Sequence, residues 1–173
     1  MSRPKGCTCS RCVGACERTP GIFKPGEAEK AAALIGKPLS EMIGNEIVID
    51  YWIGREGGNV LYYRPRKEGD ETDADGLVSF GSAFEQGRCA FLDDSNRCRI
   101  HAAKPFECRA SFSCREQPSR THKEQAVAAW RKAGNPLKRP VPEPTIGDVL
   151  ASTFTHLSNI VTARRSEPKG GTP

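Results

Sequence analysis

Eight cysteines, gathered in two short stretches of a polar 173-residue chain, constrain the fold more than any other feature of this sequence. Four lie within residues 7–16, four lie within residues 89–114, and none lies between. Apolar residues make up 37% of the chain, whereas globular proteins have about 45–50% on a count that includes glycine. A chain with so little apolar surface to bury gains stability from cross-links or from bound metal.

The compartment decides between these two possibilities. Residues 1–6 lack the apolar stretch of a secretory signal, and no window approaches the ~18 consecutive apolar residues of a membrane span. We therefore expect a cytoplasmic protein with no membrane partner, whose thiols stay reduced. In that setting clustered cysteines indicate metal ligands, whereas a disulfide framework would require export without a visible signal.

All eight cysteines are candidate metal ligands: Cys7, Cys9, Cys12, Cys16, Cys89, Cys98, Cys108 and Cys114. The first four have the spacing C-x-C-x2-C-x3-C and the last four C-x8-C-x9-C-x5-C, and neither is the spacing of a zinc ribbon. Thiolates hold zinc in tetrahedral sites and also hold iron–sulfur clusters, so the expected cofactor is zinc or an iron–sulfur cluster. The first group also reverses the order of the radical-SAM motif C-x3-C-x2-C, which argues against that chemistry.

Two residues beside the second group are candidates for supporting roles. Arg109 directly follows Cys108, and its N–H groups are expected to donate to a thiolate-rich, negative centre as a cofactor-binding residue; the alternative is a surface salt bridge. His101 follows Cys98 by three positions. It is either a ligand or, as we favour, a strand-end histidine with ordinary hydrogen bonds.

Motifs of catalysis are otherwise missing from the sequence. We find no phosphate-binding glycine loop, no nucleophile elbow and no zinc-protease histidine pair. No catalytic residue is predicted, and whether the chain is an enzyme stays open.

The formal net charge of +5 is a weak argument for nucleic-acid binding. Eight ligating thiolates around two divalent ions would lower this charge to about +1. The Lys and Arg residues are scattered along the chain, which is typical of a solvated surface. We expect a metal ion as the partner, we do not expect nucleic acid, and a protein partner remains open.

Hydrophobic periodicity and turn residues predict a small, loop-rich α+β single domain over residues 1–163, with short β-hairpins, several helices and a cysteine-ligated metal centre. The hairpins are expected at residues 46–64 and 89–101, the helices at 24–36, 37–45, just after Pro105, and at 121–134 and 145–163. The acidic stretch 65–76 is expected to be a solvated loop. Residues 164–173 are expected to be a disordered tail.

The two cysteine groups are expected to meet in space. Residues 1–22 hold too little apolar surface to fold alone. In an extended chain Cys9 and Cys12 point to opposite faces, so four thiolates of this segment do not easily surround one ion. We predict that the segment lies against residues 87–114 and shares ligands with it; a self-contained N-terminal site is the alternative.

The second cysteine group carries a resemblance to a known family. The stretch "RCAFLDD…RCRIHAAKPFECRASFSC" resembles the C-terminal signature of the YkgJ-like cysteine-cluster family, a zinc- or iron-chelating domain. The similarity covers residues 7–114. The matching positions are Cys89, Phe91, Leu92, Cys98, Ile100, His101, Lys104, Pro105, Cys108, Arg109 and Cys114.

The resemblance has one departure and one functional implication. Many members begin C-x2-C-x2-C-C, whereas here three residues separate Cys12 from Cys16 and Cys7 is additional, so the N-terminal ligands are left open. The family implies a metal-binding protein of unspecified accessory role. A related cysteine cluster in a flagellin lysine N-methylase implies the alternative, an iron–sulfur-dependent redox or methyl-transfer-like enzyme.

Overall fold

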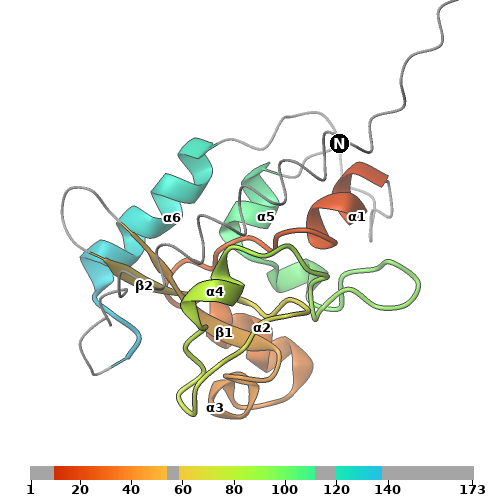
Figure 1. Ribbon diagram of the computed structural model, residues 1–173. Helices are drawn as coiled ribbons and strands as arrows, with labels where there is room; N and C mark the ends of the chain where they lie inside the picture. Colours follow the sequence, from red (N-terminus) through yellow and green to blue (C-terminus); the bar gives the residue numbers. More distant parts are fainter. Residues whose placement is uncertain (1–9, 54–58, 112–119, 138–173) are drawn as a thin grey trace, which may run out of the picture.

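The computed structural model describes residues 10–53, 59–111 and 120–137, and these residues form a small α+β arrangement, as predicted (Figure 1). Two strands form its sheet, β1 (Ile47–Trp52) and β2 (Val60–Pro65). Its helices are α1 (Ser10–Cys16), α2 (Glu27–Ile35), α3 (Leu39–Met42), α4 (Phe80–Ala83), the 3-10 helix η1 (His101–Ala103), α5 (Phe106–Ser111) and α6 (Arg120–Ala133).

The β1–β2 hairpin is the predicted one. The strands are antiparallel, with Ile47 opposite Pro65 and Trp52 opposite Val60. β-Branched and aromatic residues fill both strands because they pack well on a pleated surface. Every residue of β2 is buried, since other elements cover both of its faces.

The helix predicted at residues 24–36 is α2, and its end follows from one residue. Gly36 adopts φ +79°, and its N–H donates to the Ala32 carbonyl. This left-handed conformation suits glycine, which makes Gly36 an effective helix stop. Ala28, Ala31 and Ala32 form the buried face of α2, and the short helix α3 follows, also as predicted.

Helix α6 lies along β2, at the side of the sheet seen at the left of Figure 1. Trp130 packs edge-on against Tyr63, with ring centroids 5.4 Å apart, and its indole N–H donates to the Phe23 carbonyl. The helix ends at Gly134 (φ +92°), as predicted. The helix begins at Arg120, one residue before the predicted start at residue 121.

The second predicted hairpin is present only as a turn. Residues 89–101 contain one bridge pair, Leu92 with Cys98, and no regular strands. The Asp93 carboxylate accepts the N–H of Arg97 at 2.8 Å, and such local side-chain bonds compete with a strand ladder. Immediately afterwards the chain enters η1, which also ends any strand.

Four of the five Asp and Glu residues in the stretch 65–76 are exposed as predicted, but the prediction is wrong for Asp70. This residue is 4% exposed, and its carboxylate receives two hydrogen bonds from the Arg64 guanidinium, at 2.7 and 2.8 Å. A buried carboxylate requires such a partner. The pairing depends on the fold of β2 and was not visible in the sequence pattern.

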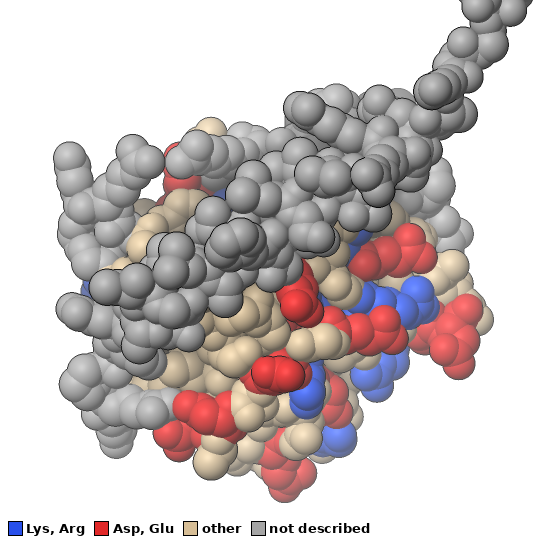
Figure 2. Space-filling model, viewed as in Figure 1, with Lys and Arg blue, Asp and Glu red and all other residues tan. Residues whose placement is uncertain are grey.

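Two further predictions, the helix at 145–163 and the tail at 164–173, fall outside the described residues. None of the described helices is long and apolar enough to cross a membrane. Over the described residues of the face in Figure 2, acidic and basic side chains are interspersed.

Candidate metal centre

Four cysteines have described side chains, and they come from separate segments of the chain. Cys16 ends α1, Cys89 and Cys98 flank the turn described above, and Cys108 lies in α5. All four are free thiols, and none of them is in a disulfide. Cys89 and Cys108 are buried, whereas Cys16 and Cys98 are partly exposed.

Backbone hydrogen bonds join the end of α1 to the segment that carries Cys89. The Cys89 N–H donates to the Cys16 carbonyl at 2.7 Å, and the Gly87 N–H donates to the Arg18 carbonyl at 2.9 Å. The prediction that the N-terminal cysteine segment lies against residues 87–114 is therefore confirmed for Cys16 and the residues that follow it.

Cys108 is brought into this region by a close approach of two backbones. The Gly21 N–H donates to the Cys108 sulfur at 3.3 Å. A Cβ atom at position 21 would lie 2.8 Å from that sulfur and 2.9 Å from the Cys108 nitrogen. Position 21 therefore accepts only glycine without displacing α5. The next residue makes a second hydrogen bond to α5, since the Ile22 N–H donates to the Glu107 carboxylate at 2.9 Å.

The electrostatics of the thiols show that they are neighbours. Burial raises the pKa of Cys16 to about 11, and Cys98 raises it further. Burial also raises the pKa of Cys89 to about 12, with contributions from Cys16 and Cys98 in the same direction. The pKa of Cys108 is raised by burial, then by Cys16 and Cys89. Cys16, Cys89 and Cys98 thus each raise the pKa of at least one other thiol, and Cys108 responds to two of them.

Several donors oppose these shifts and would stabilise thiolates. Hydrogen bonds from the backbone N–H groups of Phe91, Ile100 and Gly21 lower the pKa values of Cys89, Cys98 and Cys108 respectively. In the first two cases the donor lies two residues after the cysteine. N–H donors around sulfur are what tunes thiolate–metal centres.

Lys104 acts on both of the partly exposed thiols, whereas Arg88 acts on Cys16 and Arg99 on Cys98. Lys104 lowers the pKa of Cys16 and, less than the Ile100 N–H does, that of Cys98. Sequence reasoning gave it no role, although it belongs to the motif that carries the family resemblance. Lys104 follows η1 and acts on Cys16 at the end of α1. This proximity arises from the tertiary structure and cannot be derived from the spacing of residues in the sequence.

Arg109 is placed differently from the expectation. Its guanidinium pairs with the Glu27 carboxylate and donates to the Lys104 carbonyl. The same carboxylate accepts the N–H of Phe106 at 2.8 Å. Arg109 therefore fastens α5 to the start of α2, and a role toward a metal centre stays a prediction.

The structure describes only some of the remaining candidate ligands. The backbone N–H of His101 donates to the Cys98 carbonyl at 3.1 Å, so His101 sits directly after the turn. Cys12 lies in α1 one helical turn before Cys16. Cys7, Cys9 and Cys114 lie outside the described residues.

Within residues 10–53, 59–111 and 120–137, no group of three or more Cys, His, Asp or Glu side chains is arranged so that it could hold a metal ion. The four described thiols therefore do not form a complete metal-coordination shell in this structure. Their donor type fits zinc or an iron–sulfur cluster. Comparisons with protein-family models, with curated proteins and with solved structures find no match to this chain.

Proposed function

We propose that the chain is a metal-binding protein whose centre is built on Cys16, Cys89, Cys98 and Cys108 and holds zinc or an iron–sulfur cluster. The observation that carries the proposal is the convergence of free thiols from α1, the 89–98 turn and α5. Buried free cysteines are common as small apolar residues, but four thiols linked by electrostatic effects on pKa fit a ligand set better. The resemblance of residues 89–114 to the YkgJ-like family supports the same chemistry.

Binding of metal would complete the ligand set and change the protonation state of the thiols. A bound cation replaces the protons and offsets the cost of burying thiolates. The N–H groups of Gly21, Phe91 and Ile100 and the ammonium of Lys104 then stabilise the remaining negative charge. Closure requires side-chain movements or a ligand from the N-terminal group, in which Cys12 is one turn from Cys16.

The role that we propose for this centre is an accessory one in a reducing compartment, the cytoplasm. The metal joins the N-terminal segment, the turn and α5 into one unit, which favours a structural or interaction role over catalysis. A reducing environment keeps the four thiols free for the metal.

The test is metal analysis and a visible spectrum of the full chain purified without oxygen. We expect either colourless protein with stoichiometric zinc or brown protein with iron and sulfide. Cys16→Ser and Cys89→Ser should each lower the metal content and the melting temperature. Ala15→Ser is the matched control, because it adds a hydroxyl at a buried position of α1 and keeps every thiol. Retention of the full metal content in both cysteine variants would overturn the proposal.

A further inference from the structure

A cavity of about 230 Å3 lies between the segment after α1, the sheet and the residues that follow its strands, α4 and α6. Its walls come from every one of these elements: Thr19, Pro20, Ile22, Asp50, Tyr51, Trp52, Ile53, Tyr62, Arg64, Lys67, Ala83, Phe84 and Lys123. None of the described cysteines lines it. Thr19, Pro20 and Ile22 face the cavity, whereas Gly21 between them contacts Cys108.

The charged groups of the cavity wall are mostly neutralised by one another. The Arg64 guanidinium donates to Asp50 at 2.5 Å and to Asp70 at 2.7 and 2.8 Å. The Lys67 ammonium lies 3.9 Å from the Asp70 carboxylate and donates to the carbonyls of Ser82 and Ala83. Two cations and two carboxylates therefore form a buried group with no net charge.

Lys123 adds a positive charge that this group does not balance. Its ammonium lies 5.2 Å from the centre of the Trp52 ring, a cation–π contact, and it forms no salt bridge with a described residue. The acid that it influences most visibly is Glu107, whose pKa is raised by burial and lowered by Lys123. Glu107 accepts the Ile22 N–H and is not part of the cavity wall.

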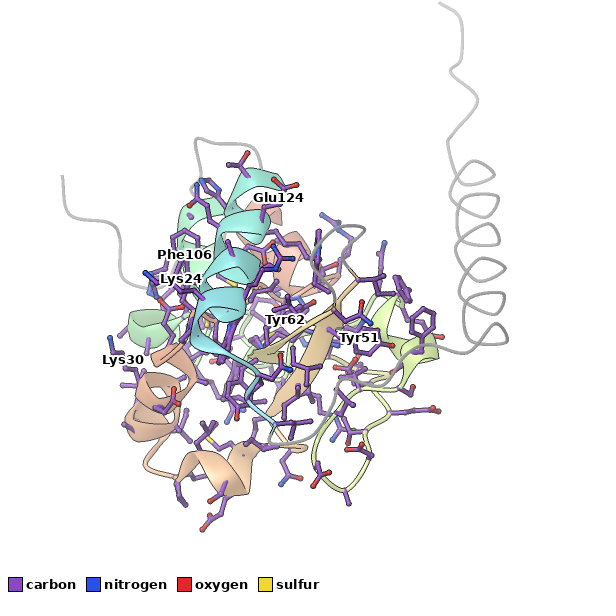
Figure 3. The ribbon with its side chains drawn as sticks, turned by 90° about the vertical axis from the view of Figure 1, so that its left-hand side faces the viewer. Lys24, Lys30, Tyr51, Tyr62, Phe106 and Glu124 are labelled. Carbon is purple, nitrogen blue, oxygen red and sulfur yellow. The ribbon has the colours of Figure 1, made fainter. Side chains whose placement is uncertain are left out.

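Apolar side chains supply the rest of the wall and its rim. Tyr51 and Tyr62 come from neighbouring strands of the sheet (Figure 3), and the Tyr51 ring stacks on Phe80 with centroids 5.6 Å apart. Ile53 and Phe84 also line the cavity and are 45% and 48% exposed. Large exposed apolar side chains beside a cavity are typical of a ligand site.

We propose that this cavity binds a small organic carboxylate with an aromatic or aliphatic body. The positive charge of Lys123 in the cavity wall selects an anion, and the aromatic wall accepts the apolar body. A cationic ligand is disfavoured because the Lys123 ammonium already lies over the Trp52 ring. The volume is below the usual 300–1,000 Å3 of ligand pockets, so the ligand is no larger than one ring with a short chain. This proposal does not depend on the metal.

The test uses the full chain and three probes of equal shape: 3-phenylpropionate, 3-phenylpropanamide and 3-phenylpropylamine. Binding is followed by tryptophan fluorescence and by the indole N–H signal of Trp52 in a nitrogen–proton NMR spectrum. We expect saturable binding of the carboxylate, binding of the amide weaker by about fivefold, and the weakest binding for the amine. One solvent-exposed ion pair is worth about 1 kcal/mol, which corresponds to about fivefold.

Three variants separate the parts of the proposal. Lys123→Gln should weaken binding of the carboxylate by about fivefold and leave that of the amide unchanged. Lys30→Gln, an exposed position of α2 away from the cavity (Figure 3), removes the same charge and should change nothing. Ala83→Leu should fill the cavity and weaken all three probes.

Two kinds of result would overturn the proposal. Absence of saturable binding for all three probes, or no effect of Ala83→Leu on binding, shows that the cavity is not the site. Equal or tighter binding of the amine, or equal effects of Lys123→Gln and Lys30→Gln, shows that a carboxylate is not selected.

Discussion

At the scale of single residues, Gly21 determines how closely the N-terminal segment approaches α5. The cysteines themselves were identifiable from the sequence because their type and clustering indicate metal ligands. The contact of Gly21 with Cys108 was not, because it joins positions 87 residues apart and depends on backbone geometry. The role of Lys104 escaped prediction for the same reason, although the residue stood within a recognised motif.

Gly21→Ala should destabilise the protein by about 1–3 kcal/mol, the usual cost of overpacking a tight contact. The added methyl group would lie 2.8 Å from the Cys108 sulfur, so α5 must move and the metal content should fall as well. The measurement is urea unfolding together with metal analysis.

Gly81→Ala is the matched control for this substitution. Position 81 lies in α4, and a methyl group added there would have no heavy atom within 4 Å. Alanine is the better helix former, so this variant should be as stable as the wild type or slightly more stable. Equal stability of the two variants would show that the close approach at Gly21 is unimportant.

At the scale of elements, the sequence predicted those that local signals define. The β1–β2 hairpin, α2 with its Gly36 stop and α6 with its Gly134 stop follow from periodicity and turn residues. The prediction of the second hairpin was wrong because the Asp93 carboxylate accepts a backbone N–H of its own turn, that of Arg97. The prediction that Asp70 is solvated was wrong because its burial depends on its pairing with Arg64. No local sequence pattern encodes this pairing.

The buried ion group on β1 and β2 gives a prediction at this scale. Arg64→Leu leaves the carboxylates of Asp50 and Asp70 buried without their main partner. Removing one partner of a buried ion pair costs about 3–5 kcal/mol, so we expect a large drop in the free energy of unfolding measured with urea.

The control for the buried group is an exposed ion pair of the same kind. Lys37 pairs with Glu46 at 2.7 Å, and the Lys37 side chain is 46% exposed. Lys37→Leu should cost less than about 1 kcal/mol, because solvent screens surface pairs. A similar cost for both variants would contradict the assignment of the Arg64 group as buried and coupled.

At the scale of the whole molecule, the described thiols lie in segments that the apolar core also joins, since Val13, Phe91 and Ile100 belong to one buried cluster. Sequence reasoning predicted that the cysteine groups meet, because residues 1–22 have too little to bury on their own. It did not predict the cavity beside them, which is built from residues of six separate segments.

The raised thiol pKa values make the stability of the metal-free, reduced protein depend on pH. The pKa of Cys16 rises from an ordinary value of 9.0 to about 11 on folding. A group with a raised folded pKa contributes stability that is fully present below the unfolded pKa and is lost as the pH rises through the folded pKa. We therefore expect the free energy of unfolding to fall between about pH 9 and pH 11.

Cys16→Ser isolates the contribution of this thiol. The wild type should lose on the order of 1–2 kcal/mol more than the variant over this pH range, as measured by urea unfolding in the presence of a chelator and a reductant. Tyr62 also has a raised pKa through burial, but it is present in both proteins and cancels in the comparison. Identical pH profiles would show that Cys16 is not buried among thiols.

The most direct test of the metal centre is a titration of the reduced, metal-free full chain with cobalt(II). Cobalt(II) occupies zinc-type thiolate sites, and its sulfur-to-metal charge-transfer absorption grows with the number of thiolate ligands. We predict a strong charge-transfer band that saturates at a fixed stoichiometry and is weakened in the Cys16→Ser, Cys89→Ser, Cys98→Ser and Cys108→Ser variants. A spectrum without this band, or one that is unchanged in all four variants, would contradict the thiolate centre proposed for this protein.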